Sequence, residues 1–205
     1  LNTIKWMATV QQAPGISEIV VALSHLLKNV SKGTQTVIPI RDELALLHDY
    51  FTIQKYKYGG SITLTHALED EAIKDNVILR FTLQPLVENA ILHGIEPTGK
   101  QGSIRISMEY AAEDEILISV TDNGMGMDGD TIQKVMAERG ENRSQTFRDM
   151  GILSVNKQIK YVFGEKYGLS IDSVVNRYTT VRIRLPKISH AEYEGKENEI
   201  TDRRR

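Results

Sequence analysis

Cysteine is absent from the 205 residues of the sequence, and neither sign of charge dominates. Without cysteine the chain has no disulfide bond, thiolate metal site or cysteine nucleophile, and a cytosolic setting is favoured. The 25 Lys and Arg residues nearly balance the 27 Asp and Glu residues, which leaves a net charge of −2. Such a charge creates no field that would attract nucleic acid or anionic lipid, so we expect function to come from a local site.

Long hydrophobic runs are also missing. No apolar stretch approaches the roughly 20 residues that a membrane-spanning helix needs, and no signal-peptide pattern follows the first residue, Leu1. Because the sequence does not begin with Met, we expect it to be part of a longer protein. The hydrophobic content of 40% is sufficient for one domain with a short helical appendage.

Apolar residues follow a helical period through the first third of the chain. Glycine or proline pairs interrupt this period, so we expect separate helices. The predicted helices cover residues 1–12, 17–32 and 40–58.

From Ser61 onward, alternating segments mix with helical ones. We expect strands near residues 62–64, 104–108, 116–120, 169–171 and 181–185, and helices near residues 81–95, 128–138 and 149–163. The resulting β-α-β-β-α-α-β-β order predicts an α+β two-layer sandwich and not a Rossmann fold. We expect residues 189–205, which are polar, to form an unstructured tail.

The first segment that contains candidate functional residues is Leu83–Gly94, whose apolar residues would form one stripe of a helix. Asn89 and His93 would lie one turn apart beside that stripe, and Glu88 would project about 100° from Asn89. A carboxylate and an amide oxygen are groups that Mg²⁺ accepts as ligands. The alternative is that these residues are only the solvated side of an amphipathic helix.

The second segment is Ile118–Met127, in which Asp122 ends an alternating strand and precedes Gly124 and Gly126. A carboxylate here can accept a hydrogen bond from the exocyclic amine of adenine, and the glycines let the backbone approach a flat base. Asp-Asn-Gly is also a good hairpin turn. The helical pattern at 131–136 disfavours the hairpin, because no partner strand returns at once.

Together the two segments resemble the N box and G1 box of the GHKL (Bergerat-type) ATPases. Their amino-acid sequences are similar to those of LytS/YesM-type sensor histidine kinases. The stretches Leu1–Trp6 and Tyr161–Gly164 are also similar to segments of that family. The resemblance therefore implies a GHKL fold, in which helices cover a mixed sheet, and it extends over nearly all of the chain before the tail.

The resemblance also implies different functions for different segments of the chain. Residues 1–58 would be a partial helical dimerisation and histidine-phosphotransfer region that lacks the acceptor histidine, and residues 59–188 would be the catalytic domain that binds ATP or ADP with Mg²⁺. The parent would be an integral bacterial membrane protein with this part in the cytoplasm. It would form a homodimer through the N-terminal helices, phosphorylate a histidine, and pass the phosphate to the receiver domain of a response regulator. This chain alone would not autophosphorylate.

Roles for individual residues follow from the same resemblance. Asn89 would coordinate Mg²⁺, with Glu88 beside it as a polarising base or an orienting group, and His93 would lie near the phosphates. Asp122 would bind the adenine amine in a pocket shaped by Gly124 and Gly126.

The remaining roles concern the rim of the site. An ATP lid at 139–150 would carry Arg143 and Arg148, although both are equally explained as solvated loop charges. Gly151 would start the next helix, with its amides toward phosphate. Thr179 would support adenine through its hydroxyl.

The sequence departs from the family pattern in two places. Gly151–Val155 lacks an expected Asn, and Asn176–Thr179 stands where Gly-x-Gly-Thr is usual, so that Tyr178 adds bulk in place of a glycine. Two alternatives remain. An ATP-driven conformational clamp could share the same pocket, although the helices before the pocket and the short lid disfavour it, and the altered glycine motif leaves open a scaffold that no longer binds nucleotide. A P-loop NTPase and a Ser/Thr/Tyr protein kinase are unsupported, because neither signature occurs.

Overall fold

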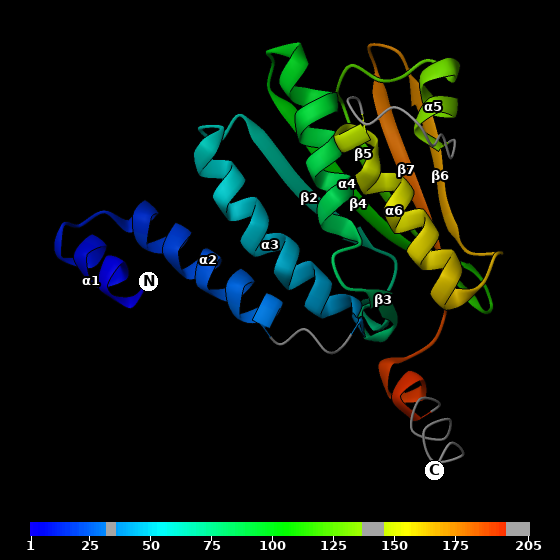
Figure 1. Cartoon of the computed structure of the whole chain (residues 1–205), viewed down its shortest axis with the longest axis horizontal. Helices are drawn as coiled ribbons and strands as arrows, with labels where there is room; N and C mark the ends of the chain where they lie inside the picture. The colour runs from blue at the N-terminus through cyan, green and yellow to red at the C-terminus, as the bar shows by residue number, and fades with distance from the viewer. Residues whose placement is uncertain (32–35, 137–145, 196–205) are drawn as a thin grey trace.

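A computed structural model describes residues 1–31, 36–136 and 146–195, with only the backbone described at 30–31 and 146–150. A five-stranded mixed sheet has the order β2-β4-β5-β7-β6, and helices α3, α4 and α6 cover one of its faces (Figure 1). The strands are β2 (Ile62–Leu68), β4 (Gly102–Ala112), β5 (Glu115–Asp122), β6 (Gly168–Val174) and β7 (Tyr178–Pro186). The helices are α1 (Asn2–Val10), α2 (Pro14–Ser31), α3 (Ile40–Lys57), α4 (Leu83–Asn89), α5 (Gly129–Met136) and α6 (Thr146–Phe163).

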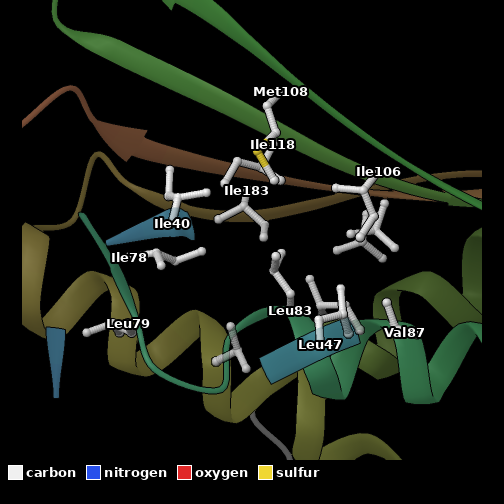
Figure 2. Close-up of a cluster of buried hydrophobic side chains, with 14 of the residues drawn as sticks. Ile40, Leu47, Ile78, Leu79, Leu83, Val87, Ile106, Met108, Ile118 and Ile183 are labelled. Atoms are coloured by element: carbon white, nitrogen blue, oxygen red, sulfur yellow. The ribbon is translucent and has the colours of Figure 1, made fainter. Parts of the chain in front are cut away.

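This arrangement confirms the predicted two-layer α+β class and the order of the elements. Strand β2 runs parallel to β4, whereas β4–β5 and β6–β7 are antiparallel hairpins. Along β5 every second side chain is buried, from Ile116 through Ile118 and Val120 to Asp122. The period of two therefore directs one face of the sheet into the core. Figure 2 shows sheet residues such as Ile106 and Ile183 opposite Leu83 and Leu47 of the helices.

A second, two-stranded sheet was not predicted. Strands β1 (Val37–Pro39) and β3 (Val77–Leu79) pair antiparallel, and all six of their residues are buried. A strand that is buried on both faces has no alternation of apolar and polar residues, so its sequence carries no period-two signal. This small sheet joins the segment before α3 to the segment before α4.

The expectation of an unstructured tail from residue 189 is wrong for its first part. The Val77 amide donates to the Ile188 carbonyl at 2.9 Å, and Asn76 forms a bridge with Ser189. Residues 190–195 are helical, and Tyr193 packs against the core. The structure does not describe residues 196–205. Pairing with a distant segment orders this stretch, although its composition is polar.

The predicted boundary between residues 58 and 59 does not separate two packed units. Residues Val37 to Leu47 share one hydrophobic core with the sheet strands and α4. Helices α1 and α2 extend away from the sheet, where α2 packs against α3 and α1 against α2 (Figure 1). In the packing, α3 is therefore part of the sheet domain, and only α1 and α2 form an appendage.

Local helix boundaries also differ from expectation. Helix α2 begins at Pro14 and not at Ser17, because proline suits the first turn, where no amide hydrogen is needed. The single helix expected over 81–95 becomes α4, a π-helix η2 (Ala90–Ile95) and a 3₁₀ turn η3 (Glu96–Thr98). Another 3₁₀ turn, η1 (Glu71–Asp75), precedes β3. Within the described residues, no helix has the length and apolar character needed to cross a membrane.

Candidate functional site

A cavity of about 450 Å³ lies between α4 and η2 on one side and the end of β5, the loop after it and β7 on the other. Its volume falls in the range of small-molecule and cofactor sites. Most of its lining is apolar, with contributions from Leu86, Ala90, Val120, Met125, Val135, Ile152, Val175 and Val181. Five of the residues predicted from the sequence also line it, namely Asn89, His93, Asp122, Gly126 and Thr179. The fold thus brings both predicted segments to one cavity.

Asp122 is the buried acid of this cavity, with 4% of its surface exposed. Sheet register places it directly opposite Thr179 on β7, on the face that points into the core. Burial raises the pKa of Asp122 to about 6, although the Gly124 amide, which donates to Oδ1 at 2.9 Å, works in the opposite direction. Oδ2 remains available to accept a hydrogen bond from a ligand.

Glycines let η2 and the loop after β5 pack backbone against backbone. A Cβ at Gly124 would overlap the main-chain carbonyl of Gly94, and one at Gly94 would lie 2.5 Å from Asp122 Oδ1. The Met125 amide donates to the Gly94 carbonyl at 2.8 Å. Gly124 therefore lies beneath the cavity without lining it. The role of Gly94 was missed, and its sequence signal was its place at the end of the first segment.

The β6–β7 hairpin touches the same loop from the other side. Gly126 has φ +67°, and a Cβ there would collide with the Val174 carbonyl. The Asn176 amide donates to the Met125 carbonyl at 2.6 Å, and Asn176 itself has φ +59°. Asparagine tolerates this left-handed conformation better than most residues, so it takes the place of the glycine usual in the family.

The bulk expected from Tyr178 does not enter the cavity. Tyr178 alternates with Thr179 along β7, so the two side chains lie on opposite faces of the sheet. The Tyr178 hydroxyl donates to Asp172 at 3.2 Å on the outer face. The altered glycine motif therefore leaves the cavity open beside Thr179.

Ser173 fixes the far end of the loop and was not found from the sequence. Its Oγ accepts from the Met127 amide at 2.8 Å and donates to the Tyr178 carbonyl at 2.7 Å. It also lies 3.0 Å from Thr179 Oγ1. A lone serine near the end of a strand carries no signal that distinguishes it from a surface residue.

Asn89 and His93 occupy the more open end of the cavity. The Asn89 Nδ2 donates to the Pro85 carbonyl at 2.7 Å, which leaves Oδ1 as an acceptor. No cluster of three or more His, Asp or Glu that could hold a metal occurs in the described part of the chain. A divalent cation at Asn89 would therefore need most of its oxygen ligands from a bound molecule and water, which suits Mg²⁺.

Glu88 does not join Asn89 in the cavity. Its side chain is exposed, and its charge contributes to raising the pKa of Tyr50 and of Lys57 on α3. The helical twist between consecutive residues thus turns Glu88 toward α3 and Asn89 toward the cavity.

The predicted role of Gly151 at a helix start is wrong, because α6 begins at Thr146. No glycine or proline lies between 146 and 150 to stop the helix from extending upstream. A Cβ at Gly151 would lie 3.2 Å from Asn89 Nδ2. Gly151 therefore lets α6 approach α4 closely at Asn89. Arg143 and the side chain of Arg148 lie outside the described residues.

Comparison with known proteins identifies the family and the fold. The family model for histidine kinase-, DNA gyrase B-, and HSP90-like ATPases matches residues 74–189. The chain belongs to this ATPase family. The histidine kinase family model matches residues 1–62, which confirms the resemblance to sensor histidine kinases found in the sequence.

A relative gives the same assignment, and two solved structures share the fold. The sensor histidine kinase YesM of Bacillus subtilis (strain 168) is 33% identical over 91% of this chain, which spans 30% of YesM. The catalytic domain of histidine kinase ThkA has a TM-score of 0.54 at 17% identity, covering 74% of this chain and 95% of that one. ThkA in complex with the response regulator TrrA has a TM-score of 0.52 at 16% identity, covering 87% and 51%. The two structures establish the fold.

Proposed function

We propose that this histidine kinase ATPase domain binds ATP and ADP with Mg²⁺ in the cavity between α4 and β5. The observation that carries the proposal is the single buried carboxylate, Asp122, set among apolar side chains and opposite Thr179. A flat base would be enclosed by the apolar lining. Asp122 would accept a hydrogen bond from the exocyclic amine of the base, and the Thr179 hydroxyl would offer a second hydrogen bond. The glycines beneath Asp122 allow the base to approach the backbone.

The phosphate end of the nucleotide would lie toward Asn89 and His93. Bound Mg²⁺ would neutralise phosphate charge, which is the main requirement of phosphoryl transfer. In this arrangement Asn89 Oδ1 supplies one oxygen ligand, and His93 lies beside the phosphates. Glu88 faces α3 and not the cavity, so its position does not support the predicted part of a polarising base.

In the whole protein, we propose transfer of the γ-phosphate to a histidine outside this chain and then to an aspartate in the receiver domain of a response regulator. The complex of ThkA with TrrA supports a partner of this class. Arg143 and Arg148 are proposed as lid residues. We also propose that α1 and α2 contribute to a homodimer, because both helices carry exposed large hydrophobic residues, including Trp6 at 67%. Attachment of the parent to the bacterial membrane is likewise proposed from its family.

Calorimetry with Mg-ADP tests the nucleotide site. We expect the unmodified chain to bind and Asp122→Ala to lose about 100-fold or more in affinity, since a charged hydrogen bond and the base pocket are removed together. Asp172→Ala removes a carboxylate from the outer face of the same sheet and should leave the affinity unchanged. Absence of binding by the unmodified chain would contradict the proposal and favour a scaffold without nucleotide.

A further inference from the structure

Helix α4, which carries Asn89, has no N-terminal cap of its own. Its N-cap residue Thr82 makes no side-chain capping hydrogen bond. Phe81, immediately before it, has φ +61°, a conformation that a bulky residue rarely adopts. The first amides of a helix have no partner within the helix, and a buried helix start needs acceptors from elsewhere.

Glu43 of α3 supplies those acceptors. Its Oε1 accepts from the Leu83 amide and its Oε2 from the Phe81 amide, both at 2.8 Å. The side chain is 1% exposed, and burial raises the pKa of Glu43 to about 7, against the effect of these amides and of Arg80. One buried carboxylate thus holds both the strained turn and the first residue of α4.

Arg80 extends this connection to α2. Its Nη1 donates to the Asn29 carbonyl of α2 at 2.8 Å, and its main-chain amide donates to the Thr36 carbonyl at 2.9 Å. The charge of Arg80 also acts on the Glu43 carboxylate. The start of α4 is therefore tied to α2 as well as to α3.

The position of α4 bears most directly on the end of the cavity where Asn89 lies. Asn89 is the last residue of this short helix, and Gly151 of α6 approaches its amide closely. Asp122 and Thr179, by contrast, are fixed by the register of β5 and β7. A shift at the start of α4 would move Asn89 and leave the two sheet residues in place.

We propose that Glu43 is a positioning residue for the phosphate end of the nucleotide site, through which the placement of α3 sets the position of Asn89. This inference rests on the proposed nucleotide binding. It makes the Glu43 contact the route by which α2 and α3 affect phosphate and Mg²⁺ binding without affecting recognition of the base. Figure 1 shows α3 and α4 lying together over the sheet, as this route requires.

The test compares adenosine with Mg-ADP. Adenosine has no phosphates, so it reports only on the end of the cavity at Asp122 and Thr179, which we call the base end; the end at Asn89 and His93 is the phosphate end. Glu43→Gln keeps the size of the side chain but turns one acceptor into a donor that faces an amide. We expect its affinity for Mg-ADP to fall about tenfold, the equivalent of one hydrogen bond, and its affinity for adenosine to stay within about twofold. Asn89→Ala should give the same pattern and serves as the reference.

Two further variants keep the outcome interpretable. Ile116→Ala opens the core at the start of β5, at the opposite end of the strand from Asp122, and it should lower the melting temperature without changing the ratio of the two affinities. Glu43→Asp keeps the charge on a shorter side chain and replaces Glu43→Gln if that protein does not fold. Equal loss of both ligands, or no loss of either, in the Glu43 variant would overturn the positioning role. Failure of the unmodified chain to bind either ligand would overturn the proposed function as well.

Discussion

The two ends of the cavity are built in different ways. At the base end, Asp122 is buried, and glycines that tolerate no Cβ pack beneath and beside it. At the phosphate end, His93 is exposed, and Asn89 sits on a helix of only seven residues whose start is held by another helix. The end at Asp122 is therefore held by close backbone packing, whereas the position of Asn89 depends on the placement of the helices.

The largest effect should come from filling the space beneath the base end. Gly124→Ala would force a Cβ into the Gly94 carbonyl, and we expect a loss of about 3 kcal/mol in the free energy of unfolding, together with loss of adenosine binding. Chemical denaturation and calorimetry measure these effects. Gly129→Ala is the matched control, since no atom lies within 4 Å of its added Cβ. Equal stability of the two variants would show that the base end is not tightly built.

The buried carboxylate of the base end should make stability depend on pH. The pKa of Asp122 is about 6 in the folded protein against 3.8 for a free aspartate. Between these values the native state keeps a proton that the unfolded state has released, so this residue lowers stability as pH rises through the window. We expect Asp122→Asn to be about 2–3 kcal/mol more stable than the unmodified protein above pH 6 and to lose that advantage below about pH 4.

Glu43 contributes a slope of the same sign between its ordinary pKa of 4.5 and about 7. The contribution of Glu43 is present both in the unmodified protein and in Asp122→Asn. The difference between their free energies of unfolding at each pH therefore isolates the contribution of Asp122. A constant difference across pH 4 to 6 would contradict the raised pKa of Asp122.

The phosphate end should give the smallest effect. Asn89→Ala removes one oxygen ligand and a hydrogen bond to the Pro85 carbonyl. We expect Mg-ADP affinity to fall about tenfold and stability to change by about 1 kcal/mol or less. Titrations with Mg-ADP and with adenosine separate the two ends. An equal loss for adenosine would show that Asn89 also shapes the base end, and the contrast between the ends would fail.

Much of this organisation could be predicted where the pattern is periodic. The alternation along β4, β5 and β7 indicated strands, and it placed Asp122 at the end of one of them. Strands β1 and β3 could not be found, because residues buried on both faces show no alternation. The position of Gly151 was misjudged because helix starts without a proline or a clear cap leave little trace in the sequence.

By itself the sequence determined the two segments, because periodicity and glycine spacing are local properties, and their resemblance to known proteins indicated the family; the role of Asp122 at the base stays a prediction. Only the tertiary structure decided that Asp122 faces Thr179, that Glu88 turns toward α3, and that Glu43 caps the helix of Asn89. These contacts join residues far apart in the chain, and their partners are selected by sheet register and helix packing. The cavity seen from the sequence as one site is thus two ends with separate supports: the sheet holds Asp122 and Thr179, and α3 holds the start of the helix that carries Asn89.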